Sequence, residues 1–480
     1  MQLSFTGRPE DLEEVVTREE MPRELAIKIL EETGIRTEAT FGYRSQGKHQ
    51  ALVKRDTLSG SGVKSIVGVR KDGDSWERAL GDGWIPGETL FTIEDAARQA
   101  DAYQLLVNDA ALRGVWEIIR PTLTEGNYVG TSHGYAFYHH GLTGIVLPNN
   151  VDGGMNAPKG TGDMVRLKFT EGGGVNSSIA IHQNATGRAW DRVKAISKLA
   201  GSGYDYGTTI KNEVNSDHFG ENNFLLGQTW AINQSSFNAL VAQGSSHYNA
   251  FVNSSEQFTE VILPLIGKYG VGEIYKRAYD AKQLGTFLMY RAAVKEATKD
   301  VLARLYDSVE SGENAENANR ENSRPDANDR LEEKLKLVEG SPMWLAGNEV
   351  RAKEKDRTYD MKITNWALAG VVVGAIEAQF QKLIDKGHSA GEAHNETEEE
   401  SSQILRRLYS ERGIGHLLRY CSMTAQVGAL RWYPEHMKAI QPIFSNMQPT
   451  YPMEIVPGIP STPTRPDIEV VGRVVRSLRL

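Results

Sequence analysis

The chain has 480 residues, too many for one ordinary hydrophobic core, so two or three domains are expected. Its 40% hydrophobic and 24% charged residues are typical of a globular protein, and the net charge of −8 gives no basis for nucleic-acid binding. It fits a protein that handles small metabolites. The single cysteine, Cys421, excludes an intrachain disulfide and indicates a reducing compartment. No apolar run approaches the ~18–20 residues of a membrane span, so no membrane segment is expected.

The first 207 residues alternate short β-like runs with helical stretches and many glycines. Clear runs cover residues 63–69, 103–107 and 178–181. Strands separated by helical patterns are typical of βαβ units with a mostly parallel sheet. We therefore predict a Rossmann-type α/β domain over residues 1–207.

A glycine-rich turn between residues 42 and 47 (GYRSQG) is the candidate phosphate-binding element. Such a turn follows the first strand and lets a pyrophosphate reach a helix N-terminus. Its first and last glycines are in place, but Arg44 fills the middle position, where it either pairs with phosphate or blocks the turn. The cofactor contacts expected here are Gly42, Arg44, Ser45, Gln46 and Gly47.

The segments before and after this turn give two further predictions, one about the strand and one about the cofactor. The preceding segment, Thr37–Phe41 (TEATF), is poor as a buried strand, which weakens the motif. After the second β-run, Arg70, Lys71 and Ser75 suit a 2′-phosphate, whereas an acidic residue would suit a ribose hydroxyl. NADP is therefore favoured over NAD, and the alternative is a basic strand end that faces solvent.

From about residue 208 the pattern becomes all-α, with amphipathic stretches at 256–269 and 289–311. The polar segment 310–330, rich in Asn and Glu, predicts a solvated loop. The proline-rich stretch 451–466 predicts a tail that runs over the surface.

The helical half repeats itself with a constant offset of 143 residues. Five pairs of identical residues share this offset: Gly227 and Gly370, Gly270 and Gly413, Gly272 and Gly415, Gly285 and Gly428, and Tyr290 and Tyr433. Coincidences in register favour a duplication over chance. We predict two copies, at residues 208–352 and 353–480.

Two pairs of carboxylates lie four residues apart in this half, Asp217 with Glu221 and Glu396 with Glu400. That spacing places both members of a pair on one face of a helix. Four converging carboxylates repel each other unless cations lie between them. Hard oxygen ligands without a Cys or His cluster favour Mg²⁺ over zinc, with two ions held jointly. The alternative is that each pair is a solvated acidic helix face.

The repeat favours the metal site, because each copy keeps one acidic pair and loses the other. The counterparts of Glu396, Glu400, Asp217 and Glu221 are, in that order, Asn253, Gln257, Asp360 and Thr364, and Ser422 corresponds to Tyr279. Two stacked copies would form two symmetric sites, of which only one keeps four carboxylates. One working site per chain is therefore expected.

With these residues in view, the sequence resembles the ketol-acid reductoisomerase family in its long, class II form. The resemblance extends to about residue 445 and rests on the segments 45–47, 67–87, 132–134, 157–160, 174–178, 215–221, 386–388, 395–397 and 421–425. It implies a Rossmann-type domain followed by an all-α, duplicated and knotted domain. It also implies Mg²⁺-dependent alkyl migration in 2-acetolactate or 2-aceto-2-hydroxybutyrate, then NADPH reduction to the 2,3-dihydroxy acid of valine and isoleucine biosynthesis.

The resemblance also assigns roles to individual residues. Two Mg²⁺ ions would be bound by the four carboxylates, with Glu221 and Glu400 assisting proton transfer. His133 would line the junction of cofactor and substrate, Lys159 would steer water and protons, and Ser422 would bind substrate. Asp109 lies in a loop expected against the cofactor. Without the family resemblance, the sequence predicts that His133 is a packed or capping histidine and that Lys159 is a surface lysine.

Departures from the family lie mainly in the cofactor half, where Arg44 replaces a glycine and Leu112 a glutamine; Asn222-Asn223 replace Arg-Gly. They motivate a second hypothesis, an inactive or weakly active homologue with impaired NADPH binding. A third is an ordinary hydroxyacid dehydrogenase that needs no divalent metal, against which the four carboxylates argue. The family predicts a homodimer or homotetramer acting on a small molecule, in the cytoplasm of a bacterium or in the mitochondrial or plastid matrix of a eukaryote.

Overall fold

The computed structural model describes residues 15–353, 360–445 and 467–478. The chain forms two compact units, Leu12–Val214 and Asn215–Ser477, which are described separately. The proline-rich stretch 451–466 lies outside the described residues. The proposed division of the helical half at residue 352 stays a prediction.

The first unit is built on a nine-stranded sheet with strand order β1-β9-β8-β7-β6-β5-β2-β3-β4. Strands β4, β3, β2, β5, β6 and β7 run parallel, whereas β8 is antiparallel to β7 and β1 to β9. The strands are β1 (Val15–Thr17), β2 (Thr37–Phe41), β3 (Lys64–Gly68), β4 (Leu90–Phe91), β5 (Ala102–Leu105), β6 (Tyr128–Thr131), β7 (Asp152–Pro158), β8 (Val175–Gln183) and β9 (Ser202–Gly207). The reversal of strand order between β2 and β5 is a Rossmann switch point, so the predicted α/β class is confirmed.

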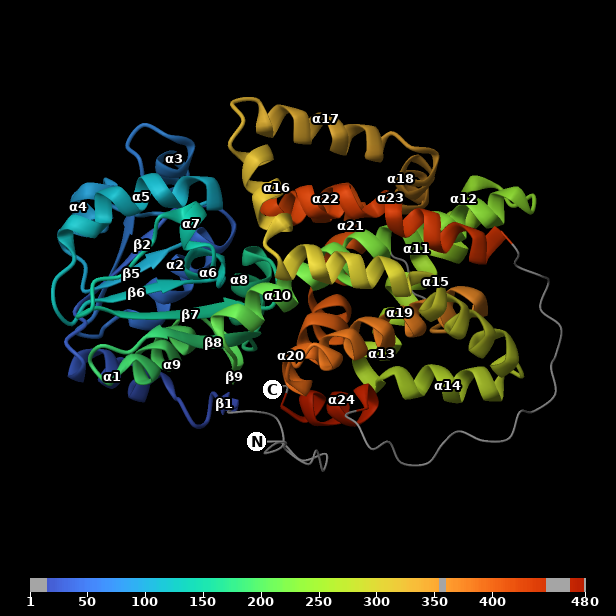
Figure 1. The fold of residues 1–480 in the computed structure, drawn as a ribbon, viewed down its shortest axis with the longest axis horizontal. Coiled ribbons are helices and arrows are strands. Elements are labelled where there is room, and N and C mark those ends of the chain that lie inside the picture. Colours follow the sequence, from blue (N-terminus) through green and yellow to red (C-terminus); the bar gives the residue numbers. More distant parts are fainter. Residues whose placement is uncertain (1–14, 354–359, 446–466, 479–480) are drawn as a thin grey trace. The chain divides into compact units, whose positions relative to one another are not determined.

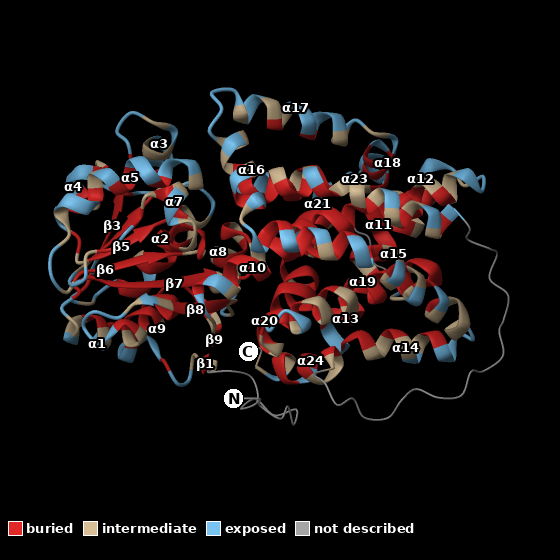
Figure 2. Ribbon diagram, in the orientation of Figure 1, coloured by how far each residue is buried: buried red, intermediate tan, exposed pale blue. Residues whose placement is uncertain are grey.

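Helices cover both faces of this sheet (Figure 1). They are α1 (Arg23–Glu32), α2 (Ser45–Leu58), α3 (Asp74–Gly81), α4 (Ile93–Ala97), α5 (Leu112–Ile119), α6 (Tyr135–Tyr138), α7 (His140–Thr143), α8 (Gly162–Thr170) and α9 (Ala189–Leu199). Helix α1 packs on α9 and α2 on α8, while α4 packs on α5. Strands β5 to β7 are buried almost throughout (Figure 2), as expected of parallel strands covered on both sides.

Strand β2 is a buried strand inside the sheet, so the expectation that Thr37–Phe41 is poor as a strand was wrong. Glu38 and Thr40 point to the same face because side chains alternate along a strand. On that face the ammonium group of Lys54, from α2, pairs with Glu38 and donates to Thr40 Oγ1 at 2.8 Å. The Ser65 hydroxyl donates to Glu38 at 3.2 Å. A polar pattern is tolerated here because its buried groups satisfy each other.

We predict that Lys54→Met lowers the free energy of unfolding by about 3–5 kcal/mol, since it leaves the Glu38 carboxylate buried without its counterion. Both side chains are only 1% exposed. Urea denaturation followed by circular dichroism measures the loss. The double variant Lys54→Met/Glu38→Gln should recover much of it. The matched control is Lys28→Met, which breaks the exposed pair with Glu32 and should cost less than about 1 kcal/mol; equal losses would contradict the prediction.

The second unit is all-helical, as predicted, and α10 (Ile210–Gly220) leads into it. Its first set of elements is η4 (Glu221–Leu225), α11 (Gly227–Ala242), α12 (His247–Phe251), η5 (Val252–Ile262), α13 (Leu263–Tyr269), α14 (Val271–Asp280), α15 (Leu284–Glu310), α16 (Glu313–Asn322), α17 (Ala327–Glu339) and α18 (Pro342–Lys353). The second set is α19 (Trp366–Asp385), α20 (Ala390–His394), η6 (Asn395–Leu405), α21 (Arg406–Arg412), α22 (Ile414–Tyr420), α23 (Met423–Ser445) and α24 (Ile468–Ser477). The elements η4, η5 and η6 are π-helices.

The two sets agree in detail, which supports the duplication. The bounds of α12, η5 and α13 reappear 143 residues later as those of α20, η6 and α21. Ser246 and Ser389 cap the N-termini of α12 and α20 in the same way. Gly270 and Gly413 end the corresponding helices α13 and α21 with φ of 90° and 87°, where a side chain would be strained.

The repeat also includes the C-terminal helix, at a shorter offset. Helix α18 packs on α12, and α24 packs on α20. Gly347 of α18 faces Phe251, while Gly472 of α24 faces His394, the residue 143 positions after Phe251. Helices α18 and α24 thus occupy corresponding places 125 residues apart.

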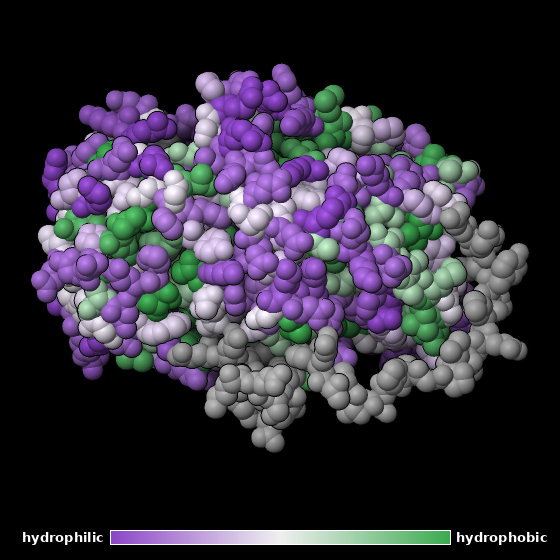
Figure 3. Space-filling model, in the orientation of Figure 1, coloured by the Kyte–Doolittle hydropathy of each residue, from purple (hydrophilic) through white to green (hydrophobic). Residues whose placement is uncertain are grey.

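The segment 310–330 is largely helical, so its prediction as a loop was wrong. Helix α16 packs on α23, where Arg431 donates to Glu313 at 2.6 Å. Helix α17 packs on α22, and Arg419 of α22 pairs with Glu332 and Glu339. Much of the surface over these helices is hydrophilic, with some apolar atoms among the polar ones (Figure 3), and Leu337 of α17 is 78% exposed.

Helix α19 is long and apolar enough to cross a membrane by length and composition, which the sequence expectation overlooked. In the structure 72% of its apolar window is buried. It packs against α15 and therefore serves as a core helix of the second unit.

Candidate active site

The predicted cofactor residues follow neighbouring parallel strands of the first unit. Gly42 follows β2, Arg70 follows β3, Asp109 follows β5, His133 follows β6 and Lys159 follows β7. Carboxyl ends of parallel strands share one edge of a sheet, and Rossmann-type units bind their ligands beyond that edge. The fold therefore gathers these predicted residues at one edge.

The glycine-rich turn depends on its two outer glycines. Gly42 has φ of 102°, and a Cβ there would overlap the carbonyl of Leu106 at the end of the neighbouring strand. A Cβ at Gly47 would overlap the Gly42 carbonyl. Arg44 has extended backbone and is exposed, directly before α2. The middle position tolerates a side chain because that side chain projects away from the packed turn.

The turn is tied to the loop after β7. Gln46 donates to the Gly160 carbonyl at 2.7 Å, and the Ser45 hydroxyl accepts from Gly162 N at 3.4 Å. Gly160 and Gly162 lie one and three residues after Lys159 in the chain. These two hydrogen bonds therefore hold the glycine-rich turn next to the segment of Lys159.

The residues predicted to contact the 2′-phosphate are accessible. Arg70 and Lys71 are exposed after β3, and Ser75 is half-buried in the first turn of α3. Asp109 is half-buried after β5. Leu112, which replaces the family's glutamine, is only 3% exposed and packs in the core.

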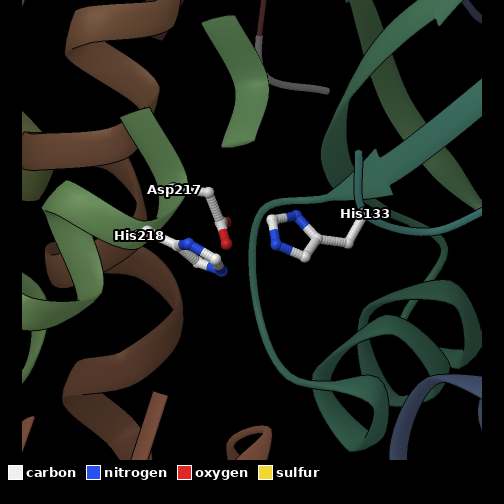
Figure 4. Close-up of side chains that lie close together, drawn as sticks. All are labelled: His133, Asp217 and His218. Carbon is white, nitrogen blue, oxygen red and sulfur yellow. The ribbon is translucent and has the colours of Figure 1, made fainter. Parts of the chain in front are cut away.

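A buried carboxylate, Glu213 of α10, links two of the predicted catalytic residues. Its Oε2 accepts from His133 Nδ1 at 2.9 Å and from Gly134 N at 2.7 Å. Its Oε1 accepts from Lys159 Nζ at 3.2 Å. The His133 ring, drawn in Figure 4, is therefore oriented through Nδ1. Lys159 is only 2% exposed, so its reading as a surface lysine was wrong.

Glu213 was missed by the sequence reasoning. Burial alone would raise the pKa of Glu213, but His133, Lys159 and the Gly134 N–H hold that pKa well below its usual range. Glu213 is thus an anion fixed between His133 and Lys159. The available signal was its position four residues before Asp217 on the same helix.

The four predicted metal ligands lie on two short segments of the second unit. Asp217 lies in the last turn of α10, next to His218 (Figure 4), and Glu221 begins the π-helix η4. Glu396 and Glu400 both lie in η6 and are buried. Residues four apart share a face in a π-helix as well as in an α-helix. π-Helices are rare and frequent at functional sites.

These two segments pack against each other. Contacts join η4 and η6 directly. A Cβ at Gly220, which precedes Glu221, would lie 3.0 Å from the Glu396 carbonyl oxygen. The fold therefore brings together the two backbone segments that carry Glu221, Glu396 and Glu400, and the joint binding of metal by the four carboxylates stays a prediction.

The uncharged counterpart of this site, formed by residues of both copies, shows how these positions relate. Thr364, the counterpart of Glu221, donates its hydroxyl to Asn253 Oδ1 and its N–H to Gln257 Oε1, both at 2.9 Å. Asn253 and Gln257 are the counterparts of Glu396 and Glu400. The uncharged residues join by hydrogen bonds, which ionised carboxylates cannot donate to one another. Ionised carboxylates brought close together repel one another unless a cation lies between them, and hard oxygen donors fit Mg²⁺.

Ser422 caps helix α23. Its hydroxyl accepts from Ala425 N at 2.9 Å and the residue is exposed. The hydroxyl proton remains available for donation. Its role in substrate binding stays a prediction.

A Rossmann-type unit with site residues along one sheet edge, joined to a duplicated helical unit, is the architecture of an oxidoreductase with a nicotinamide cofactor. Residues 34–205 match the acetohydroxy acid isomeroreductase NADPH-binding domain, and residues 210–355 and 365–450 match the ketol-acid reductoisomerase C-terminal domain. The chain therefore belongs to the ketol-acid reductoisomerase family, and the predicted family and enzyme class are confirmed.

Named relatives agree with this assignment. The chain is 38% identical over 350 residues to the mitochondrial ketol-acid reductoisomerase of Saccharomyces cerevisiae, covering 73% of this chain and 86% of the relative. It is 30% identical over 416 residues to the chloroplastic enzyme of Pisum sativum, covering 84% and 70%. The solved structure of an NADH-preferring ketol-acid reductoisomerase from an uncultured archean has a TM-score of 0.61 at 25% identity, covering 71% of this chain and 98% of that one.

Proposed function

We propose that the protein converts 2-acetolactate or 2-aceto-2-hydroxybutyrate into the corresponding 2,3-dihydroxy acid, with NADPH as reductant and two Mg²⁺ ions. The observation that carries the proposal is the packing of two acidic π-helices, η4 and η6, in a family of reductoisomerases. Asp217, Glu221, Glu396 and Glu400 would hold the ions. When bound, Mg²⁺ supplies Lewis-acid stabilisation of charge on the neighbouring oxygens of the substrate.

The remaining roles belong to residues of this chain. Glu221 and Glu400 assist proton transfer, and Lys159 and His133 orient water and protons while Glu213 holds both. Ser422 donates its hydroxyl to substrate. The exposed cations Arg70 and Lys71 favour a 2′-phosphate and so NADPH, although some family members prefer NADH.

The test is NADPH oxidation at 340 nm with 2-acetolactate, with and without Mg²⁺. Activity that requires Mg²⁺ supports the proposal, and metal-independent reduction would favour an ordinary dehydrogenase. No activity despite Mg²⁺ binding would favour the weakly active homologue. In that case Arg44→Gly with Leu112→Gln should raise activity strongly. The exposure of Arg44 supports the active enzyme, in which Arg44 pairs with phosphate.

We predict that Arg70→Ala/Lys71→Ala lowers kcat/KM for NADPH by about 100-fold or more, since each of the two charged hydrogen bonds to phosphate contributes roughly 1.5–3 kcal/mol. The value for NADH should change little. Steady-state kinetics with both cofactors measure the ratio. Lys64→Ala is the matched control, because Lys64 is an exposed lysine at the opposite end of β3. An unchanged NADPH to NADH ratio would contradict the assignment.

The proposal also covers the oligomeric state of the protein and its cellular compartment. A homodimer or homotetramer formed through the helical units is expected, and light scattering after gel filtration measures it. The named yeast and pea relatives are mitochondrial and chloroplastic, which supports an organelle matrix if the chain is eukaryotic.

A further inference from the structure

Gln379, on α19, connects the two segments that carry the carboxylates. Its Oε1 accepts from Asn223 Nδ2 at 2.8 Å and from Phe224 N at 2.9 Å, both in η4. Its Nε2 donates to the Glu396 carbonyl in η6 at 2.7 Å. The side chain is fully buried. One amide therefore fixes the spacing between the segments of Glu221 and Glu396.

The segment η4 needs such a support, because its backbone departs from helical geometry. Asn223 has φ of −103° and ψ of −115°, and Leu226 has φ of −130° and ψ of −68°. A buried backbone that leaves helical geometry must find other partners for its N–H groups. The Phe224 N–H finds one in Gln379.

The two copies of the internal repeat differ at the position of Gln379. Ser236, the counterpart of Gln379, accepts from Asn365 Nδ2 at 3.2 Å. Asn365 also donates to the carbonyl of Asn253, the counterpart of Glu396, at 2.9 Å. The same carbonyl is thus held in both copies, but the position of Gln379, whose long amide spans two segments, is occupied by the short Ser236 in the copy that lacks the acidic π-helix.

We propose that Gln379 is a positioning residue for the divalent-metal site. It holds the segment of Glu221 at a fixed distance from that of Glu396, so that both carboxylates are placed before a cation binds. The inference rests on the proposed metal site. Outer partners of metal ligands typically change metal affinity by about 10–100-fold.

The test compares Gln379→Met and Gln379→Asn with the matched control Ser236→Ala. Methionine has similar length without hydrogen bonds, whereas asparagine keeps an amide that is one methylene too short to reach both segments. The full-length, metal-free proteins are titrated with Mg²⁺ by isothermal calorimetry, without substrate. We expect the dissociation constant to rise about 10–100-fold for Gln379→Met, less for Gln379→Asn, and not for Ser236→Ala.

The possible results distinguish a failure of the inference about Gln379 from a failure of the proposed metal-dependent function. An unmodified protein that does not bind Mg²⁺ would overturn the metal site and the inference together. Normal Mg²⁺ binding by the Gln379 variants, with a lower urea midpoint in EDTA, would overturn only the inference and leave Gln379 a structural residue. If Gln379→Met does not fold, Gln379→Asn decides between these outcomes by the same titration.

Discussion

Glu396→Gln is expected to lower reductoisomerase activity by about a thousandfold, which corresponds to roughly 4 kcal/mol of lost transition-state stabilisation. The change preserves size and keeps an oxygen in the buried η6 segment, but it removes one of the four charges that are proposed to hold the cations. Mg²⁺ affinity should fall with activity. NADPH oxidation at saturating 2-acetolactate and calorimetric titration with Mg²⁺ measure the two effects.

The matched control is Glu399→Gln. Glu399 lies on the same π-helix and is 5% exposed, but it is not a predicted ligand. Its variant should keep Mg²⁺ binding and most activity. Equal losses for both variants would show that acidity of the segment, rather than ligation by Glu396, determines activity.

The sequence predicted the two architectures and the repeat because these depend on periodicity and register. Predictions from the sequence failed where contacts between residues far apart in the chain determine the local structure. Strand β2 looked too polar because its partner Lys54 lies on the following helix, 16 residues beyond Glu38. The segment 310–330 looked like a loop because a partner that holds it, Arg431, lies 118 residues after Glu313 in the chain.

The constant offset of 143 residues does not include helix α24 in the repeat. Helix α24 corresponds to α18 at an offset of 125 residues instead. The shared residues are Gly347 and Gly472, Val350 and Val475, and Arg351 and Arg476. A search that allowed a change of offset would have found this helix.

Residue types and spacing alone predict the four carboxylates as one site, and the structure shows that the segments η4 and η6 pack together. Their ligation of metal stays a prediction. Glu213 could not be recognised in the same way, because its partners His133 and Lys159 lie 80 and 54 residues earlier. Gln379 likewise connects segments that only the fold brings together.

Glu213→Gln is expected to reduce kcat by roughly a hundredfold or more, the range for a lost acid–base arrangement. A neutral amide keeps the shape of Glu213 but removes the charge that orients the His133 ring and pairs with Lys159. Mg²⁺ affinity in the absence of substrate should stay unchanged. Steady-state kinetics across pH, together with calorimetry, separate this effect from that of Glu396→Gln.

The same variant should change how stability depends on pH. The pKa of Glu213 is held low in the folded protein, below the value of about 4.3 expected when unfolded. Its stabilisation is therefore complete above that pH and is lost as pH falls below it. Urea unfolding at a series of pH values should show the unmodified protein losing its advantage over Glu213→Gln below pH ~4. A constant difference across that range, with unchanged kcat, would mean that Glu213 orients neither His133 nor Lys159.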